Sequence, residues 1–244
     1  MNIVITAGGT SEYIDSVRKI TNSSSGKLGA TIAQTLLKRK DIDNIYYIHT
    51  PKAIKPKGNK ITYVEVVNTQ DVKEAVQSVL KTHRVDWFIH SMAISDYYVD
   101  YVSNAKIVAE DLKNEDDFEY ALKNPKNKLD NTNKLSSYED NLIVVLKQTP
   151  KIISLIKKLS PNTKLIGFKL LTDTTEENLI DVGYNLLQKN NCDYVVANDL
   201  KNISKDTHIA FIIDKAKNII KTKNKEDIAK KINKLIPKSK KIMI

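Results

Sequence analysis

The chain has 244 residues, of which 41% are hydrophobic and 28% are charged, which suits a folded globular protein with a sizeable core. No apolar run approaches the roughly 18 residues that a membrane span needs, and the N-terminus shows no signal-peptide pattern. The single cysteine, Cys192, excludes an internal disulfide and favours a reducing, cytoplasmic location.

The formal net charge of +10 raises the question of a polyanionic partner. Nearly all of this charge is lysine, because arginine occurs only as Arg18, Arg39 and Arg84. The lysines are spread over the chain, and the abundance of Asn and Ile beside them is typical of an AT-rich genome. We therefore expect an anionic small-molecule substrate, with no membrane partner and no nucleic-acid partner, although a nucleic-acid-binding protein remains an alternative.

Apolar, β-branched runs alternate with amphipathic runs of helical period along most of the chain. The predicted strands are Asn2–Ala7, Asn44–His49, Ile61–Val66, Asp86–Met92, Asn141–Lys147, Lys164–Leu170 and Asp193–Ala197, followed by a hairpin of His208–Asp214 and Asn218–Thr222. The predicted helices are Gly26–Lys40, Gln70–Thr82, Thr149–Leu159, Glu176–Asn191 and Lys225–Leu235.

This alternation predicts a Rossmann-like α/β fold, with a mostly parallel sheet, helices on both faces and a C-terminal hairpin. We expect one domain over residues 1–244. Residues 103–138 break the alternation and are rich in Asn, Asp, Glu and Lys, which predicts a long mobile flap with room for one short helix. Ligands of such sheets bind at the carboxyl ends of the strands, so we expect a crevice there.

Two turns near the N-terminus have the composition of an anion-binding site. The first, Gly8-Gly9-Thr10, follows the first strand, and the second, Ser23–Gly26, opens the first helix. Each turn offers backbone N–H groups, and Arg18 and Asn22 between them suit a phosphate and a carbonyl. The alternatives are a tight turn without a ligand and a helix N-cap.

A nicotinamide cofactor is disfavoured. A dinucleotide-binding fold places an acidic residue at the end of the second strand, where this chain has His49 and Thr50. No tyrosine is followed four residues later by lysine, so the catalytic pair of short-chain dehydrogenases is missing as well. A sugar-nucleotide epimerase or reductase is therefore an alternative that these residues speak against.

Polar or aromatic residues lie at the ends of three further strands. Asp96 has the chemistry to bind Mg²⁺ or the amino group of a base, or it caps a turn. Phe168 either stacks on a nucleobase or belongs to the core. Asn198 and Asp199 end a strand with polar groups that a core does not need.

Together these segments resemble the phosphopantothenate–cysteine ligase family, the phosphopantothenoylcysteine synthetases, over almost the whole chain. The first two segments are the most specific, and the later ones occur in the order of the family. The matching segments are Thr6–Thr10 with Glu12, Ile14 and Asp15; Val17–Arg18 and Asn22–Gly26; Met92–Tyr97; Lys134–Ser137; Lys147–Ile153; Leu165–Lys169; and Ala197–Asp199.

The resemblance implies the short, monofunctional form of this enzyme, without the flavin-dependent decarboxylase that is fused to it in many bacteria, and hence no flavin. It also implies the reaction. CTP, assisted by Mg²⁺, activates 4′-phosphopantothenate as an acyl-cytidylate, and cysteine then forms the amide, with release of CMP and pyrophosphate. Bacterial members typically use CTP and animal members ATP. Family members are usually homodimers.

The resemblance further implies three catalytic residues. Asn22 would hold the acyl intermediate, Arg18 would support it or bind an anionic group, and Lys134 on the flap would reach the triphosphate. The implied nucleotide-binding residues are Gly8, Gly9, Thr10, Ser91, Met92, Asp96, Lys134, Pro150, Lys151, Ile152, Ile153, Phe168 and Lys189. The implied substrate-binding residues are Asn22, Ser24, Ser25, Gly26, Ala197, Asn198 and Asp199. Mg²⁺ would bind through the nucleotide phosphates, with Asp96 as a candidate protein ligand.

The chain departs from the family pattern at three places. Larger relatives carry a Lys-x-Lys-Lys flap, whereas this chain has one flap lysine further along, followed by Ser136 and Ser137. Leu171 and Thr172 stand where many members have Glu-Thr. Lys189 lies about one residue away from the register of the helix lysines that contact the nucleotide in the larger forms.

Overall fold

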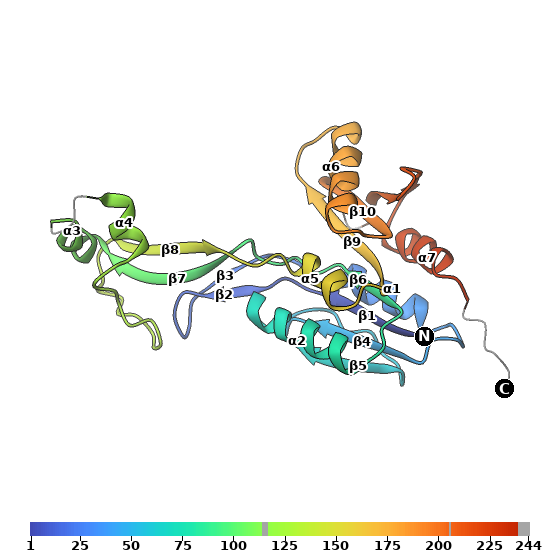
Figure 1. The fold of residues 1–244 in the computed structure, drawn as a ribbon, viewed down its shortest axis with the longest axis horizontal. Coiled ribbons are helices and arrows are strands. Elements are labelled where there is room, and N and C mark those ends of the chain that lie inside the picture. The colour runs from blue at the N-terminus through green and yellow to red at the C-terminus, as the bar shows by residue number, and fades with distance from the viewer. Residues whose placement is uncertain (114–116, 205, 239–244) are drawn as a thin grey trace.

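The computed structural model describes residues 1–113, 117–204 and 206–238. Its centre is an eight-stranded sheet in which six adjacent strands are parallel and the last two form an antiparallel hairpin (Figure 1). The order across the sheet is β12 (Ile219–Thr222), β11 (His208–Asp214), β10 (Tyr194–Ile203), β9 (Lys164–Leu171), β6 (Trp87–His90), β1 (Asn2–Ala7), β4 (Asn44–His49) and β5 (Ile61–Glu65).

Helices cover both faces of this sheet, which confirms the predicted fold class. On one face α1 (Lys27–Leu36) packs beside α7 (Lys225–Leu235) over a core that includes Ile5, Ile166 and Ile212. The other face is covered by α2 (Thr69–Thr82), α5 (Ile152–Leu159) and α6 (Glu176–Lys189). Both faces are apolar because the central strands are buried on two sides.

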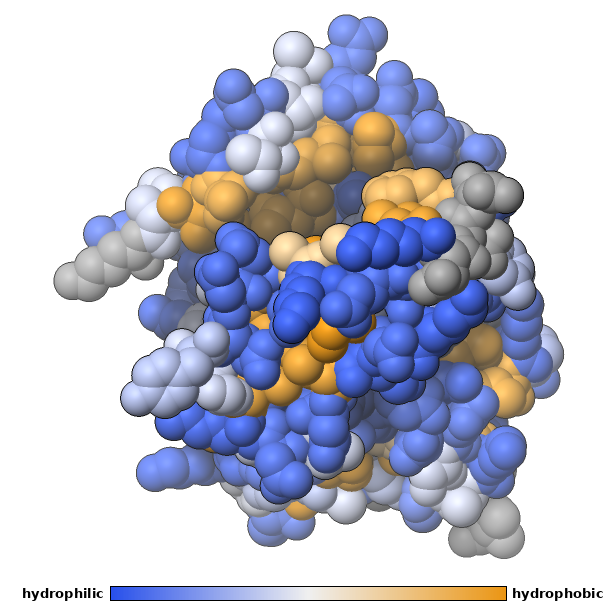
Figure 2. Space-filling view, turned by 90° about the vertical axis from the view of Figure 1, so that its left-hand side faces the viewer, coloured by the Kyte–Doolittle hydropathy of each residue, from blue (hydrophilic) through white to orange (hydrophobic). Residues whose placement is uncertain are grey.

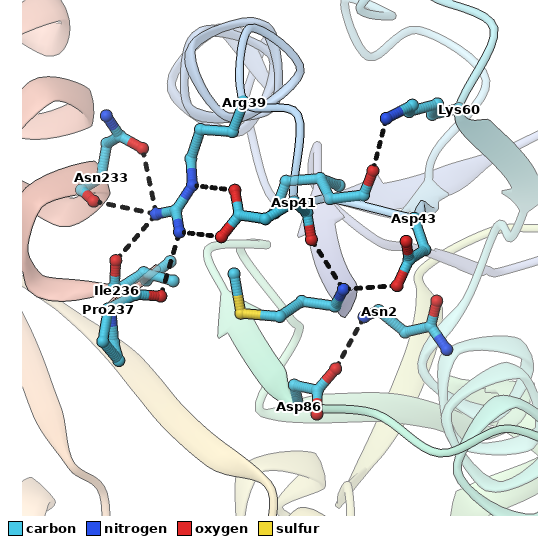
Figure 3. A network of polar contacts seen from close by, with 11 residues as sticks. Asn2, Arg39, Asp41, Asp43, Lys60, Asp86, Asn233, Ile236 and Pro237 are labelled. Carbon is cyan, nitrogen blue, oxygen red and sulfur yellow. Dashed lines mark hydrogen bonds and ion pairs between the residues drawn. The ribbon is translucent and has the colours of Figure 1, made fainter. Parts of the chain in front are cut away.

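Arg39 joins the C-terminal ends of α1 and α7 (Figure 3). Its guanidinium binds the Asp41 carboxylate through two N–H groups, at 2.9 and 2.7 Å, and donates to the carbonyl oxygens of Asn233, Ile236 and Pro237. A planar guanidinium suits such multiple, fixed contacts. The two helices are therefore held side by side at the edge of the sheet where its parallel strands begin.

An extended arm leaves the sheet after β6 and was only partly predicted. It is a two-stranded ribbon of β7 (Tyr97–Asn104) and β8 (Leu142–Gln148), which projects far from the body (Figure 1). The ribbon leads to two short helices, α3 (Ala105–Lys113) and α4 (Phe118–Lys123).

The prediction of one loop-like flap over residues 103–138 was therefore wrong in part, although residues 114–116 lie outside the described ranges. The strand near Asn141–Lys147 exists, but it pairs in the arm and not with the central sheet. The run of tyrosine and valine in β7 favours a strand, and the sequence interpretation overlooked it. A small ribbon of β2 (Ser11–Tyr13) and β3 (Lys19–Thr21) lies near β7.

Within the described ranges, the helices are all too short or too polar to span a bilayer. The buried Cys192 has a thiol whose pKa is raised to about 12 by burial, which makes it a poor nucleophile.

Candidate active site

The Gly8-Gly9 turn is filled by the chain itself. Gly8 has a positive φ of 97°, a conformation that favours glycine. A Cβ on Gly9 would lie 1.7 Å from the backbone carbonyl oxygen of Asn22, so only glycine allows this approach. The backbone N–H of Asn22 also donates to the carbonyl oxygen of Thr10 at 3.0 Å. The two predicted turns therefore meet, and the turn places Asn22 directly over the end of β1.

Thr10, Ser91 and Met92 hold the ends of β1 and β6 together. The fully buried Thr10 hydroxyl accepts from the backbone N–H of Ser95 at 2.8 Å. The Ser91 hydroxyl donates to the carbonyl oxygen of Thr6 at 2.6 Å, and the backbone N–H of Met92 donates to the Thr6 hydroxyl at 3.2 Å. Through these hydrogen bonds, the three predicted nucleotide-binding residues stabilise the ends of β1 and β6. Contact of the three residues with a nucleotide stays a prediction.

Asp15 is a buried carboxylate that sequence reasoning assigned no role. It accepts hydrogen bonds from the backbone N–H groups of Val17 at 2.8 Å, Arg18 at 2.7 Å and Leu135 at 3.2 Å, and it binds the Arg18 guanidinium at 2.8 Å. The backbone hydrogen bond from Arg18 is the main cause that lowers the pKa of Asp15. Asp15 therefore stays ionised and orients both segments.

Lys134 is brought beside Arg18 by this carboxylate. Its neighbour Leu135 is buried and bonded to Asp15, and the side-chain amide of Asn131 donates to the carbonyl oxygen of Ile14 at 2.9 Å. Lys134 itself is exposed, and the Arg18 side chain is 39% exposed. The two predicted cations therefore lie in one part of the molecule and both reach solvent.

Asp96 and Lys151 form an ion pair where the arm meets α5, and both side chains are exposed. Thr149 fixes this meeting point, because its hydroxyl donates to the carbonyl oxygen of Ser95 at 2.6 Å and its N–H to that of Asp96 at 2.9 Å. Lys151 is the N-cap of α5 without a side-chain cap, so N–H groups of the first turn are unsatisfied by a cap. The structure thus gathers the predicted nucleotide residues Asp96, Pro150 and Lys151.

Ile152, Ile153 and Phe168 contribute mainly to the core. Ile152 is buried in the layer under α5, and Ile153 is half-buried and contacts Gly167 closely. Phe168 is half-buried against the core under α1 and α7. The ring of Phe168 is thus on the opposite face of the sheet from α5, and its stacking on a base stays a prediction.

Lys189 does not join these residues within the chain. It lies in the last turn of α6, which runs antiparallel to β9 and β10, and therefore at the edge where the parallel strands begin. The predicted crevice lies at the opposite edge. The sequence spacing of Lys189 is near that of the family, but spacing alone does not show that α6 runs antiparallel to the strands.

Asp199 serves the fold more than a crevice. Its buried carboxylate accepts from the backbone N–H groups of Asp173 at 3.1 Å, Thr174 at 2.9 Å and Lys201 at 3.0 Å. Burial raises the pKa of Asp199, but these donors outweigh it and the pKa is lowered. Ala197 is fully buried, so Asn198 is the member of this segment with a polar group left for a ligand.

The segment before α1 leaves donors accessible. Gly26 is the N-cap, with φ of 67° and no side-chain cap. The exposed Ser24 and Ser25 hydroxyls accept only long hydrogen bonds, both at 3.4 Å, from the N–H groups of Gly26 and Lys27. Their free hydroxyl hydrogens and the first turn of α1 are suited to an anion.

No group of three or more His, Cys, Asp or Glu in the described ranges could hold a metal ion. Asp96, the candidate ligand for Mg²⁺, has the Lys151 ammonium as its neighbour. The residues therefore fit a metal that arrives with nucleotide phosphates better than a metal site built by the protein.

A Rossmann-like sheet with polar residues at its carboxyl edge defines a class of ligand-binding α/β proteins. Within this class, the family described as "DNA/pantothenate metabolism flavoprotein C-terminal domain" matches residues 1–129 and 120–239. The chain belongs to this family.

A curated relative is the coenzyme A biosynthesis bifunctional protein CoaBC of Thermococcus kodakarensis, 32% identical over 199 residues, which are 82% of this chain and 41% of the relative. The chain thus spans less than half of that relative. A crystal structure of the DNA/pantothenate metabolism flavoprotein from Streptococcus pneumoniae is 38% identical, with a TM-score of 0.83 over 96% of this chain and 97% of that one. The C-terminal domain of a CoaBC protein is 26% identical, with a TM-score of 0.68 over 96% and 92%.

Proposed function

We propose that this protein is a phosphopantothenate–cysteine ligase of coenzyme A biosynthesis, and that residues 1–244 act as one ligase domain. The carboxylate of 4′-phosphopantothenate attacks the α-phosphate of CTP, which forms the acyl-cytidylate and releases pyrophosphate. The cysteine amine then attacks the acyl carbon, the amide forms, and CMP leaves. The relatives named for coenzyme A biosynthesis support the pathway.

The observation that supports this proposal is the ribbon of β2 and β3 at the end of β1. It carries Asn22 at its base and Arg18 at its far turn, where Asp15 also binds the segment of Lys134. Asn22 lies on the Gly9 turn, and Asp15 holds Arg18 and the segment that ends in Lys134. Both chemical steps develop negative charge on phosphate or carbonyl oxygens. Preorganised donors and cations stabilise such charge better than mobile ones.

We assign the residue roles on this basis. The Asn22 amide would donate to the carbonyl oxygen of the acyl-cytidylate, and Lys134 would pair with the triphosphate as it loses pyrophosphate. Arg18 would support the acyl group or bind an anionic part of the acid. Asp96, Lys151 and the first turn of α5 would hold the nucleotide.

Mg²⁺ would bind to the nucleotide phosphates, where it would neutralise charge on the leaving pyrophosphate. The condensation transfers no electrons, so it requires neither flavin nor NAD. The absence of an acid at the end of β4, where His49 is buried, also speaks against a ribose-binding site for NAD.

We further propose a homodimer that forms through the arm. The two-stranded ribbon exposes several large apolar side chains. A single two-stranded ribbon has no second layer of structure that would bury them. They are Tyr97, Tyr98, Leu142 and Leu146, which are 48%, 36%, 38% and 42% exposed. A second copy is the partner that this surface fits, and sedimentation of an arm variant with these residues changed to Ser or Thr tests it. We expect a cytoplasmic enzyme without nucleic-acid partners.

The experiment that tests the function is pyrophosphate release from the purified protein with 4′-phosphopantothenate, Mg²⁺ and cysteine, with CTP compared against ATP. We expect release that requires the acid and is faster with CTP. Release with ATP but not with CTP would show that ATP is the nucleotide substrate. If neither nucleotide supports release, the reductase alternative becomes the leading hypothesis. The next measurement is then the absorbance of NAD(P) bound to the purified protein.

A further inference from the structure

Lys169 is a half-buried lysine at the carboxyl end of β9, and the roles assigned above leave it out. Within the described ranges, its ammonium forms no ion pair with a carboxylate. Lysine is rarely withdrawn from water without a partner, because burial disfavours a charged group. The unpaired ammonium of Lys169 therefore suits an anionic ligand.

The side chain of Lys169 lies on the face of the sheet that α5 and α6 cover. Side chains of a strand alternate between the two faces, so Lys169 shares its face with Gly167 and Leu171. A Cβ on Gly167 would lie 3.0 Å from the side chain of Ile153 in α5, and Leu171 packs against the apolar cluster under α6. Lys169 is thus held between two positions that pack against helices.

Lys169 lies just beyond the N-terminal end of α5. Ile153 is at the level of Gly167, and α5 runs antiparallel to the β9 strand that follows it. Two residues along β9 span about 6.6 Å, whereas α5 extends only from Ile153 back to Ile152, about 1.5 Å further. The Lys169 side chain therefore leaves the sheet past the end of the helix, where Lys151 precedes it.

Met92 stands at the same level next to β9. The ladder between β6 and β9 ends with His90 opposite Gly167, and Met92 follows two residues after His90. The bridge that Ala93 forms with the chain after β1 shows that this segment continues along the sheet. Met92 also belongs to the apolar layer under α2 and α5, on the face of Lys169. Lys169 thus lies beside a predicted nucleotide-binding residue.

This end of β9 is open to a ligand. Leu170, the next residue, is 48% exposed. Figure 2, which views the molecule from the side of the arm, shows apolar side chains in a hollow at the height of β9 and β10. A ligand that enters from this side can therefore reach the end of the strand that carries Lys169.

The flap of this chain offers few cations to a triphosphate. Lys134 is followed by Ser136 and Ser137, where larger relatives have further lysines. Lys134 also lies in the part of the molecule that contains Arg18, because the Asp15 carboxylate binds both segments. The charge of the flap is therefore directed to the ribbon of β2 and β3, and the nucleotide residues at α5 need a cation of their own.

Lys151 does not fully supply this cation, because its ammonium is paired with the Asp96 carboxylate. Lys169 comes from the sheet on the same face as α5, and its charge is not neutralised by a carboxylate in the described part of the chain. An ammonium on a strand is also held more firmly than one on a flap. A phosphate bound here would meet a preorganised cation.

We propose that Lys169 binds the α-phosphate of the nucleotide. This rests on the proposed function. The nucleoside lies at Asp96 and the first turn of α5, and the α-phosphate is the phosphate nearest to it. Lys134, at the ribbon, pairs with the two phosphates that leave as pyrophosphate. The Lys169 ammonium pairs with an anionic oxygen on the phosphorus that the acid attacks.

The test measures the binding of cytidine, CMP and CTP by calorimetry, with Mg²⁺ and without the acid, in wild type and two variants. In Lys169→Met we expect the Kd of CMP and that of CTP to rise by the same factor, about 10-fold. The Kd of cytidine should change less than about twofold. Lys169→Arg keeps the charge and should stay within about threefold of wild type. Lys158→Met is the matched control, since it removes an exposed ammonium at the other end of α5.

Three outcomes would overturn the proposal. The first is an unchanged Kd of CMP in Lys169→Met, and the second is an equal rise for cytidine, which would mean that the nucleoside pocket has lost its shape. The third is a rise for CTP without a rise for CMP, which would move Lys169 to the terminal phosphates. Lys134→Ala, by contrast, should show this third pattern.

The same titrations separate this proposal from the ligase activity. If pyrophosphate release requires ATP, then adenosine, AMP and ATP replace the cytidine series. If Lys169→Met loses affinity for CMP and CTP while wild type releases no pyrophosphate with 4′-phosphopantothenate, the proposed function fails and the phosphate contact stands. If wild type is an active ligase and Lys169→Met keeps the wild-type Kd of CMP and KM for CTP, the function stands and the contact is overturned.

Discussion

The carboxylate of Asp15 accepts a hydrogen bond from the backbone N–H of Leu135 at 3.2 Å, although 120 residues separate the two. The same carboxylate binds the guanidinium and backbone N–H of Arg18. One buried anion therefore fixes a cation of the N-terminal segment and the segment that presents Lys134. Loss of this anion should disturb the site without disturbing the sheet.

Asp15→Asn should lower the rate of pyrophosphate release at least tenfold. An asparagine amide has one acceptor oxygen and no charge, so it cannot serve three backbone donors and a guanidinium. Limited proteolysis should also cut faster within residues 125–140. Asp130→Asn is the control, because among the described residues Asp130 accepts from Thr132 alone, in the same connection. A normal rate in Asp15→Asn would mean that this carboxylate does not position the site.

Asn22→Ala should separate the two half-reactions. The backbone bond of Asn22 to Thr10 survives this change, so the turn should keep its shape. We expect pyrophosphate release to persist in part and amide formation to fall about 100-fold, because an oxyanion donor is worth this order of magnitude. Rapid quench with mass spectrometry should detect the acyl-cytidylate, while Ser23→Ala behaves as wild type. Product formation at the normal rate in Asn22→Ala would refute the assigned role.

The parallel sheet could be predicted from the sequence because its strands are continuous apolar runs. β1, β4 and β11 begin and end where the pattern placed them. The arm could not be recognised, since neither β7 nor β8 alternates regularly between buried and exposed residues. The strand at β8 was therefore found but assigned to the wrong sheet.

The site, like the fold, could be predicted from the sequence only in part. Motifs close in sequence, such as Gly9 with Asn22, were predicted to act together, and the structure places them in contact. The role of Asp15 and the low pKa of His208 depend on surroundings that only the fold determines. For Asp15 a local signal existed, because an aspartate two residues before Val17 forms an Asx turn.

Lys134→Ala should slow activation more than Lys128→Ala does. Leu135 is anchored next to Lys134, whereas the N–H of Leu129, next to Lys128, donates to the carbonyl oxygen of Val102 in the arm. Both segments are anchored, but Lys134 is held near the Asp15–Arg18 pair and Lys128 near the arm. We expect pyrophosphate release to fall about 10-fold to 100-fold in Lys134→Ala and less than about twofold in Lys128→Ala. The reverse order would assign the triphosphate to Lys128.

Gly9→Ala should displace Asn22 and destabilise the protein. The added methyl group would lie 1.7 Å from the Asn22 carbonyl oxygen, and backbone cannot yield as a flexible side chain does. We expect a loss of about 1–3 kcal/mol in the free energy of unfolding, together with loss of amide formation. Gly58→Ala is the matched control, because its nearest neighbours are the side-chain methyl groups of Leu37. Full activity in Gly9→Ala would contradict the close contact.

Acid should weaken the fold well above the range in which carboxylates titrate. Burial lowers the pKa of His90 to about 4, and burial with the Lys225 charge lowers that of His208 to about 4, from an ordinary value of 6.5. Between these values the unfolded chain binds more protons than the folded one, so stability falls as the pH falls from 6.5 toward 4. Each histidine contributes up to about 3 kcal/mol at neutral pH.

The measurement is urea unfolding between pH 7.5 and 4.5 in wild type and in His208→Asn. The variant lacks one of three buried imidazoles with lowered pKa values, those of His49, His90 and His208, so it should lose less stability than wild type over this range. The buried aspartates with lowered pKa values, such as Asp193, lose their contribution only below about 3.8, outside the range tested. His83→Asn, which removes an exposed imidazole stacked on Tyr46, should follow the wild-type curve. Equal losses in wild type and His208→Asn would show that His208 is not held neutral by the fold.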